Sequence, residues 1–391
     1  MDIFAAGVAS GGLVAWLALL ALRGQFWRSD CVLDPDGSEL EASGAWPDVC
    51  AVVPARDEAS VLSETLPTLL GQHYPGRFWI VLVDDRSSDG TGDLALDLAR
   101  EYGQSERLTL VRSEALLPGW SGKLWAMAQG VRRGEAFAPE YWLFTDADIA
   151  HHPDNLAALV RQAQADRRDL VSQMVRLRCR SVWEVLLIPA FVFFFQKLYP
   201  FSWVNDPAQP TAAAAGGCIL VRREALERAG GLAEVRGSLI DDCALAAAIQ
   251  RSGGRLWLAL SRRTRSLRPY PGLDSIWKMV ARTAFTQLDY SFATLALTVG
   301  AMGFLYLAPP VLALVGLVTA QPPVALPALL AWLLMAVAYL PTLRFYEQPP
   351  WLALALPLIA VLYVAMTIDS AYRHWRGEGG AWKGRVYGGD Q

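Results

Sequence analysis

The chain has 391 residues, of which 53% are hydrophobic and 19% charged, and its formal net charge is −3. This length allows one large domain with additional elements or two ordinary domains, and the composition is more apolar than that of most soluble proteins. The small net charge and the lack of like-charge blocks exclude the usual signals of a nucleic-acid partner.

The first predicted element is an uncharged apolar segment, residues 3–22, that is long enough to cross a bilayer as a helix. No basic residue precedes it, so we expect an anchor and not a cleaved secretory signal. Arg23 and Arg28 follow it, and this positive charge predicts that the next domain faces the cytoplasm. We assign residues 1–28 to the anchor and the polar residues 29–47 to a linker.

From Asp48 onwards, short apolar strands alternate with amphipathic helices. This alternation predicts an α/β fold with right-handed crossovers, in which helices flank a mainly parallel sheet. The expected strands are residues 52–53, 79–83, 108–111, 141–144, 170–177, 218–221 and 256–260. The expected helices are residues 60–70, 91–102, 123–133, 153–165, 222–229 and 241–251. The five cysteines are scattered without Cys-x-x-Cys spacing, which predicts reduced thiols in a cytosol-facing domain.

Residues 182–203 form an unusual segment in which aromatic side chains crowd together around Pro189. Arg176, Arg178 and Arg180 precede it. Aromatic side chains beside basic ones are typical of a segment that lies in the membrane interface. The alternative is a buried core helix, because the polar face of the segment carries few charges.

The carboxyl-terminal third contains three further apolar segments, residues 293–320, 324–340 and 351–368. Each is long enough, or nearly so, to span a bilayer. The Pro309–Pro310 pair predicts a kink in the first segment. The sequence therefore predicts about three carboxyl-terminal transmembrane helices in addition to the amino-terminal one.

We assign residues 48–290 to the α/β domain, 291–370 to the transmembrane helices and 371–391 to a basic tail. The orientation of the carboxyl-terminal spans is left open, because two signals conflict. Three spans after a cytoplasmic domain leave the tail outside, whereas its arginines and lysines favour the inside. A re-entrant or interfacial segment is the alternative to three full spans.

An Asp-x-Asp pair, Asp146 and Asp148, follows the strand expected at residues 141–144. Carboxylates two residues apart project to the same side of an extended chain, and open α/β sheets bind ligands at the carboxyl ends of their strands. Paired carboxylates there suit a hard divalent cation that holds a diphosphate. A solvated loop is the alternative. The adjacent His151 and His152 are candidate metal ligands, with loop surface as their alternative.

Acidic residues also end the first two strands, at Asp57 and at the pair Asp84 and Asp85. Acidic side chains at this position bind ribose hydroxyls in dinucleotide folds, and Asp57 could accept hydrogen bonds from a base edge. Helix capping is the alternative interpretation for Ser88 and Asp89, which precede the next helix.

Two further candidates lie at helix amino termini. Lys123 ends a short glycine-bearing loop before a helix, a favourable place for phosphate, although the loop does not match a Walker motif. Asp241 and Asp242 begin another helix after flexible glycines. Asp241 suits an N-cap, and Asp242 is the candidate general base that takes a proton from an acceptor hydroxyl.

In this order, the motifs resemble those of the family 2 glycosyltransferases of GT-A fold. They are Asp57, residues 84–91 (Asp-Asp-x-Ser-x-Asp-Gly-Thr in outline), residues 119–123, the Asp-x-Asp pair, residues 216–226 and the Asp-Asp pair. The resemblance covers roughly residues 48–289. With its anchor, aromatic segment and carboxyl-terminal spans, the chain is similar to ceramide-glucosyltransferase-like enzymes, and most closely to the hopanoid-biosynthesis-associated bacterial glycosyltransferase.

This resemblance implies a membrane-bound inverting glycosyltransferase with its catalytic domain in the cytoplasm and its spans in the cell membrane. The donor it implies is a nucleotide-sugar, usually a UDP-sugar. The implied acceptor is a lipid in hopanoid or glycolipid biosynthesis. Asp57 and Asp85 would bind the nucleoside and Lys123 the diphosphate. Asp146 and Asp148 would hold a divalent metal, Mg or Mn, and Asp242 would be the base.

The sequence departs from the family pattern at two places. The base motif usually reads Glu-Asp, where this chain has two aspartates. The late Gln/Arg-x-x-Arg-Trp motif is absent, and Trp277 to Arg282 stands in its place. Arg282 would then meet the leaving diphosphate, and Trp277 would cover the acceptor or anchor the chain at the membrane interface. A processive polysaccharide synthase and a non-catalytic membrane scaffold that binds nucleotide-sugar are the alternative functions.

Overall fold

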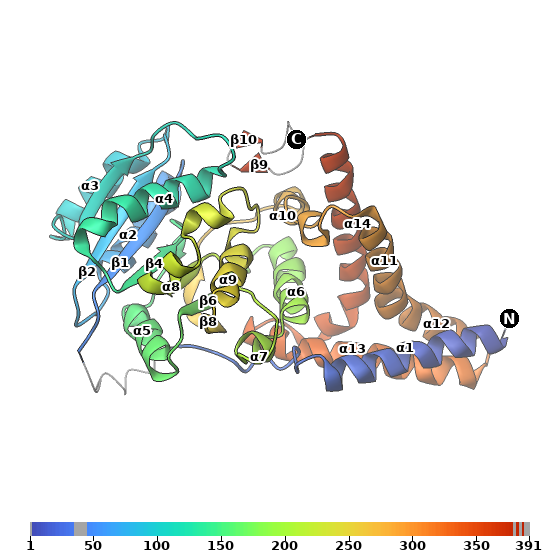
Figure 1. Cartoon of the computed structure of the whole chain (residues 1–391). Coiled ribbons are helices and arrows are strands. Elements are labelled where there is room, and N and C mark those ends of the chain that lie inside the picture. The colour runs from blue at the N-terminus through green and yellow to red at the C-terminus, as the bar shows by residue number, and fades with distance from the viewer. Residues whose placement is uncertain (1, 35–44, 378–380, 383–384, 387–391) are drawn as a thin grey trace. The chain divides into compact units, whose positions relative to one another are not determined.

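The computed structural model describes residues 2–34, 45–377, 381–382 and 385–386, and these form two compact units. The sheet unit comprises Asp30–Arg178 and Trp203–Pro269, and the helical unit comprises Met1–Ser29, Cys179–Ser202 and Tyr270–Gln391. Figure 1 shows the elements of both units. Most of the expected linker at residues 29–47 lies outside the described residues.

Within its described residues, the sheet unit is built on an eight-stranded sheet in the order β3-β2-β1-β4-β7-β6-β8-β5. The strands are β1 (Val49–Ala55), β2 (Phe78–Asp84), β3 (Leu108–Arg112), β4 (Tyr141–Thr145), β5 (Ile149–Ala150), β6 (Leu170–Arg176), β7 (Cys218–Arg222) and β8 (Leu256–Ser266). Strands β3, β2, β1 and β4 run parallel, as do β6 and β8, whereas β7 and β5 pair antiparallel with their neighbours. The predicted α/β fold with a mainly parallel sheet is confirmed.

Helices cover both faces of this sheet. They are α2 (Ala59–Leu70), α3 (Thr91–Glu101), α4 (Gly122–Gly134), η1 (Glu135–Phe137), α5 (Asn155–Ala165), α8 (Arg223–Arg228), η2 (Leu232–Val235) and α9 (Asp241–Arg251). Every residue of β1 is buried, as expected for a central parallel strand. On one face its alternate side chains join a core with α2, α3 and α5. On the other face α4 packs so closely that a Cβ on Gly130 would lie 2.3 Å from Val52 Cγ1.

The topology brings several loops to one edge of the sheet. Because β1, β2 and β4 are parallel neighbours, their carboxyl ends lie side by side. Strand β7 is antiparallel to β4 and pairs Cys218 with Thr145, so its amino end starts at the same edge. The loops after β1, β2 and β4 and the glycine turn before β7 therefore surround one region, where open α/β sheets bind their ligands.

The described part of the helical unit contains four helical segments long and apolar enough to cross a membrane, Ile3–Leu22, Phe292–Val318, Pro322–Phe345 and Pro350–Trp375. This agrees with the prediction of one amino-terminal and about three carboxyl-terminal spans. The elements are α1 (Asp2–Leu22), α6 (Val182–Leu198), α10 (Leu273–Ala281), η3 (Thr286–Leu288), α11 (Phe292–Met302), η4 (Gly303–Leu307), α12 (Ala308–Val318), α13 (Pro322–Phe345), η5 (Pro350–Ala355) and α14 (Leu356–Trp375), with the short strands β9 (Ala381–Trp382) and β10 (Arg385–Val386). The four-residue helix α7 (Phe201–Val204) lies where the chain passes from this unit to the sheet unit.

The proline pair in the second span coincides with a π-helical turn, η4, just before it. Proline has no N–H, so Pro309 cannot donate to the carbonyl of Leu305 four residues earlier. The indole N–H of Trp16 donates to that carbonyl instead, at 2.8 Å. A side chain from α1 thus satisfies the backbone group that the expected proline kink leaves without its usual donor.

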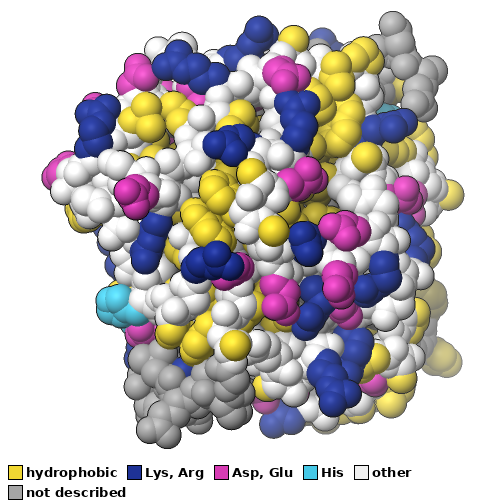
Figure 2. Space-filling view, turned by 60° about the vertical axis from the view of Figure 1, so that its left-hand side comes forward, with side chains coloured by type: hydrophobic (Ala, Val, Ile, Leu, Met, Phe, Trp, Pro, Cys, Tyr) yellow, Lys and Arg dark blue, Asp and Glu magenta, His cyan; other side chains and the backbone are white. Residues whose placement is uncertain are grey.

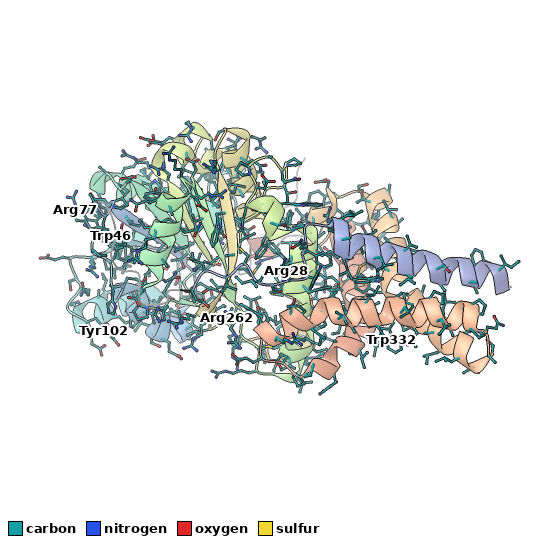
Figure 3. The ribbon with its side chains drawn as sticks, turned by 90° about the horizontal axis from the view of Figure 1, so that it is seen from below. Arg28, Trp46, Arg77, Tyr102, Arg262 and Trp332 are labelled. Atoms are coloured by element: carbon teal, nitrogen blue, oxygen red, sulfur yellow. The ribbon has the colours of Figure 1, made fainter. Side chains whose placement is uncertain are left out.

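Helix α6 carries much of the aromatic segment and packs among the other helices of this unit. The ring of Phe193 is buried and contacts Phe26 and Tyr339, and the hydroxyl of Tyr363 donates to the Leu187 carbonyl. The core-helix alternative therefore describes these inward side chains, and the interfacial location of the segment stays a prediction. Along the same helices, Trp332 of α13 donates to a carbonyl of η5 (Figure 3).

Candidate active site

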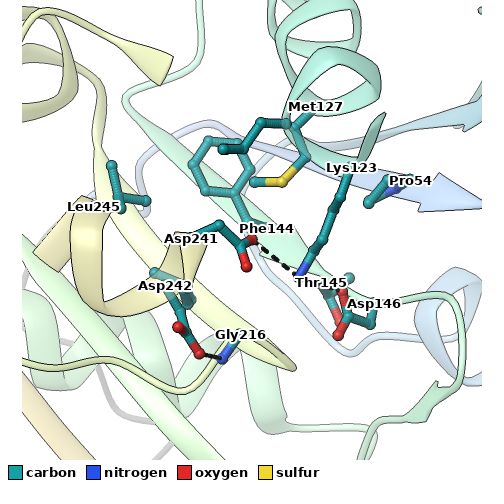
Figure 4. Close-up of a pocket in the computed structure, with 12 residues that line it drawn as sticks. Pro54, Lys123, Met127, Phe144, Thr145, Asp146, Gly216, Asp241, Asp242 and Leu245 are labelled. Atoms are coloured by element: carbon teal, nitrogen blue, oxygen red, sulfur yellow. Dashed lines mark hydrogen bonds and ion pairs between the residues drawn. The ribbon is translucent and has the colours of Figure 1, made fainter. Parts of the chain in front are cut away.

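A small pocket lies in the sheet unit, at the edge where β1 and β4 end. Its charged lining converges from three elements: Lys123 from α4, Asp146 after β4, and Asp241 and Asp242 from α9 (Figure 4). Pro54, Met127, Phe144 and Leu245 contribute apolar side chains, and Gly216 lies between the charged groups. Lys123, Asp146 and Asp242, all singled out in the sequence, therefore lie in one pocket.

Lys123 is the cation at the centre of this cluster. It follows the helix N-cap Ser121, whose hydroxyl accepts from the Leu124 N–H. Its ammonium lies 2.9 Å from Asp146 Oδ1 and 3.1 Å from Asp241 Oδ2. Burial alone would lower the pKa of Lys123, but the surrounding carboxylates outweigh burial and raise it above its ordinary value. The lysine is therefore charged at any physiological pH, at a helix amino terminus that also favours anions.

Asp242 is held by the backbone and not by the lysine. Its Oδ2 accepts from the Gly216 N–H at 2.8 Å, and its Oδ1 accepts from the Cys243 N–H at 2.8 Å. Burial and the charge of Asp241 raise the pKa of Asp242 to about 6. A carboxylate with this pKa is ionised at neutral pH yet takes up a proton readily, as a general base requires. Asp241 begins α9 and pairs with Lys123, and Ile240 occupies the N-cap position.

Asp146 and Asp148 both follow β4, but their side chains lie in different environments. Burial raises the pKa of Asp146, and the negative charge of Asp148 raises it further. The ion pair with Lys123 partly offsets this increase. Asp148 is buried, and its Oδ2 accepts from Ser266 Oγ at 2.8 Å and from Arg268 Nε at 3.1 Å. The guanidinium of Arg268 also donates to Glu58 Oε1 at 2.8 Å. Asp148 is therefore a buried, hydrogen-bonded carboxylate, whereas the Asp146 side chain is 35% exposed beside Lys123.

These two carboxylates suit a divalent cation that shares its coordination with a substrate. No group of three His, Cys, Asp or Glu side chains that could hold a metal occurs among the described residues. Mg²⁺ in nucleotide sites is typically held by one or two carboxylates together with phosphate oxygens and water, not by an all-protein cage. The chemistry of Asp146 and Asp148 fits that mode.

His151 is hydrogen-bonded to residues on either side of the Asp-x-Asp loop. It is buried, its Nε2 lies 3.0 Å from Thr145 Oγ1, and its Nδ1 lies 3.3 Å from Asn155 Nδ2. Burial lowers its pKa to about 4, so the ring is neutral at physiological pH. With both ring nitrogens engaged inside the protein, His151 is neither a loop-surface residue nor an available metal ligand. His152 is half-buried beside Asp154.

The two acids expected to bind the nucleoside lie at the same sheet edge but outside the lining of the pocket described above. Asp57 follows β1 in a left-handed conformation, and its Oδ1 accepts from the N–H and hydroxyl of Ser88. Asp85 follows β2, is fully buried and pairs with Arg56 at 3.4 Å. Each acid therefore ties its strand-end loop to the neighbouring one. Asp89 caps α2, because its Oδ2 accepts from the Ala59 N–H.

Residues 47–286 match the sequence profile of a family described as "Glycosyltransferase like family 2". This is more than half of the chain. The chain belongs to this family. The matched residues include most of the sheet unit and also α6 and α10 of the helical unit.

Relatives of this chain include proteins named for glycolipid synthesis. The beta-monoglucosyldiacylglycerol synthases of Trichormus variabilis and a Nostoc species are each 26% identical over 228 residues, which cover 56% of this chain and 44% of the relative. The chain thus matches less than half the length of these relatives. An N-acetylglucosaminyltransferase of Mesorhizobium japonicum is 26% identical over 140 residues, or 36% of this chain and 31% of the relative.

A solved structure extends the likeness to nearly the whole chain. The mannosyltransferase PcManGT from Pyrobaculum calidifontis, in complex with GDP-Man and Mn2+, aligns with a TM-score of 0.57 at 22% identity. The alignment covers 95% of this chain and 99% of that one. At this identity the likeness shows the fold, and the predicted GT-A fold is confirmed.

The remaining residues that the sequence predicted for the site belong to the helical unit. Arg282 follows α10 and is exposed. The indole N–H of Trp277 donates to Asp369 Oδ2 at 2.7 Å, and Arg373 also pairs with that carboxylate. Asp369 was not singled out in the sequence, because a lone acid near the end of an apolar segment has no motif around it.

The sequence analysis also missed three polar residues bonded around Asp148: Glu58, Ser266 and Arg268. Glu58 stands beside the predicted Asp57, but Ser266 and Arg268 lie more than a hundred residues from the Asp-x-Asp pair. They reach Asp148 because the short strand β5 pairs with the end of β8. The only signal in the sequence is an arginine after a strand, which is too common to predict a role.

Proposed function

We propose that this protein is a membrane-bound inverting glycosyltransferase that moves a sugar from a nucleoside diphosphate sugar, most simply a UDP-sugar, to a lipid acceptor. The observation that carries this proposal is the meeting of Lys123, Asp146 and Asp242 in one pocket at the carboxyl edge of the sheet. The pocket offers a cation for the leaving diphosphate and, within the same space, a carboxylate to take a proton.

In the proposed reaction, the acceptor hydroxyl oxygen attacks the anomeric carbon as its proton passes to the carboxylate of Asp242. The bond between the anomeric carbon and the donor phosphate oxygen breaks on the opposite side, so the configuration inverts. Lys123 contributes positive charge next to the departing diphosphate, where preorganised charge lowers the barrier most. The backbone N–H groups of Gly216 and Cys243 hold Asp242 in place.

A divalent cation, Mg or Mn, would be held by Asp146 and Asp148. When bound, it would neutralise negative charge that develops on the diphosphate. Asp57 and Asp85 are proposed to contact the nucleoside through the loops they organise, and Arg282 to contact the diphosphate. The complex of the structural relative with GDP-Man and Mn2+ supports a nucleotide-sugar and a metal in this fold.

The lipid acceptor is proposed from the membrane character of the chain and from its relatives. In the described part of the chain, four helices are apolar and long enough to span a bilayer, which would keep the enzyme beside a lipid acceptor. Two relatives are named as glucosyldiacylglycerol synthases. A hopanoid acceptor is proposed from the family resemblance of the sequence. Arg23 and Arg28 after the first span favour a cytoplasmic catalytic domain in the cell membrane.

The proposal is tested by incubating membranes that contain the protein with a panel of labelled UDP-sugars and a divalent metal, and by identifying the labelled lipid. Membranes without the protein are the control. We expect one sugar to enter one lipid class, and chelation with EDTA to abolish the transfer. Comparing the lipid extract of a deletion strain with its parent tests the acceptor in the cell. Unchanged glycolipids and hopanoids in that strain would contradict a lipid product.

A further inference from the structure

The Asp148 carboxylate is bonded asymmetrically. Both of its described hydrogen bonds fall on Oδ2, one from the Ser266 hydroxyl and one from Arg268 Nε. Among the described residues, no protein group donates to Oδ1. The side chain is only 7% exposed, so the position of each oxygen is fixed by its surroundings. A carboxylate held in this way has one oxygen satisfied by the protein and the other left for a ligand.

The donors to Oδ2 are fixed by backbone hydrogen bonds beside the Asp-x-Asp loop. Strand β5 pairs Ile149 with Ser266, and the N–H of Leu267 donates to the Asp148 carbonyl at 2.9 Å. The N–H of Arg268 donates to Ser266 Oγ at 3.3 Å. The end of β8 is therefore bonded to the acidic loop through its main chain as well as its side chains.

Glu58 holds the far side of the arginine. Its Oε1 lies 2.8 Å from Arg268 Nη2, and its own N–H donates to Thr91 Oγ1 at the start of α3. The guanidinium thus bridges two carboxylates that are 10% and 7% exposed. Two acids so deeply buried need such a cation, because an unpaired buried charge is costly. The planar fork of arginine donates to both carboxylates from separate nitrogens in a fixed geometry.

We propose that Arg268, together with Ser266 and braced by Glu58, is a positioning residue that orients Asp148 so that its Oδ1 faces the divalent cation of the donor site. The proposal rests on the proposed function. It assigns to Arg268 the role that hydrogen-bond partners of metal ligands commonly have, fixing the orientation of the ligand. The competing hypothesis is that Arg268 pairs with Asp148 in place of the metal, so that the metal has to displace it. The two roles predict opposite changes in metal affinity.

The test is a titration of the purified full-length protein in detergent micelles with Mn²⁺ and saturating UDP, in which free Mn²⁺ is followed by electron paramagnetic resonance. We expect Arg268→Gln to weaken Mn²⁺ binding by about 10- to 100-fold and Ser266→Ala by about 10-fold, the usual range for such partners. Arg222→Gln is the matched control, because it removes an arginine–carboxylate pair with Glu140 at the opposite end of β4. It should leave Mn²⁺ binding unchanged.

Unchanged or tighter Mn²⁺ binding by Arg268→Gln would overturn the positioning role, and tighter binding would identify Arg268 as a competitor. Thermal unfolding of each variant shows whether it is folded. If Arg268→Gln does not fold, Ser266→Ala decides the question alone, since it removes only one of the two bonds to Oδ2. Sugar transfer by the wild-type protein distinguishes a failure of this inference from a failure of the proposed function. Transfer with unaltered Mn²⁺ affinity in both variants contradicts only this inference, whereas absence of both transfer and Mn²⁺ binding in the wild type contradicts the proposed function as well.

Discussion

The pH dependence of sugar transfer follows directly from the surroundings of Asp242. Its pKa is about 6, and a general base acts only when it is deprotonated. We therefore expect kcat/KM for the donor to be half-maximal near pH 6, to fall by about tenfold per pH unit below that value and to reach a plateau above pH 7. His151 does not add to this profile, because burial lowers its pKa to about 4. Initial rates of lipid labelling between pH 4.5 and 8.5 measure it.

Two substitutions should move this profile in opposite directions. The charge of Asp241 raises the pKa of Asp242, and that of Lys123 lowers it. Two neighbouring unit charges interact by about 1 kcal/mol when water screens them fully and by more in a partly buried site, and one pKa unit corresponds to about 1.4 kcal/mol. Asp241→Asn should therefore shift the half-maximal pH down by at least about 0.5 unit, and Lys123→Met should shift it up by a similar amount, whatever each does to the plateau. A profile that stays in place in both variants would show that another group is the base.

The other predictions concern packing around the site and in the membrane helices. A Cβ on Gly216 would lie 3.2 Å from the carboxylate of the proposed base and 3.3 Å from the lysine ammonium, so Gly216→Ala should lower kcat/KM by about tenfold while the melting temperature changes little. Gly130→Ala should destabilise the protein by about 1–3 kcal/mol in thermal unfolding because α4 is forced off β1, whereas Gly300→Ala, which has open space around it, should not. Trp16→Phe leaves the Leu305 carbonyl without its described donor and should cost about 1–3 kcal/mol in detergent, and an unchanged melting temperature would contradict that role.

The charged surface of the protein gives no comparable prediction. On the face drawn in Figure 2, basic and acidic side chains lie interspersed among apolar ones and form no broad field of one sign. This agrees with a chain whose net charge is −3. Strong steering of a ligand by a surface field of one sign is therefore not expected from this face.

Much of the fold could be predicted from the sequence because its strands are short apolar runs bounded by turns. Strand β4 was expected at residues 141–144 and ends at Thr145, so the acids that follow it lie where the prediction put them. The two-residue strand β5 could not be predicted, because two residues carry no periodicity. That short strand is what joins β8 to the Asp-x-Asp loop, so the partners of Asp148 were missed with it.

The helical segments show a second limit of the sequence pattern. Residues 182–203 are apolar and aromatic nearly all round, and such a segment gives no sign of which face is buried. In the structure Glu184 is fully buried in α6, where its carboxylate accepts from the N–H groups of Arg180, Ser181 and Tyr270. Ser181 and Glu184 form a capping box at the start of α6, and this spacing is visible in the sequence. The donor that the sequence could not predict is the N–H of Tyr270, which only the fold brings to this carboxylate.

In the proposed reaction, Asp242 takes the acceptor proton in a pocket that also holds the donor diphosphate. The most direct measurement is the rate of sugar transfer to lipid by membranes that contain Asp242→Asn, with Asp97→Asn, a change in an exposed ion pair, as the control. Loss of a general base costs about 10²- to 10⁴-fold, so we predict a loss of that size for Asp242→Asn, wild-type rates for the control and retained binding of UDP by both. Wild-type transfer by Asp242→Asn would contradict the account.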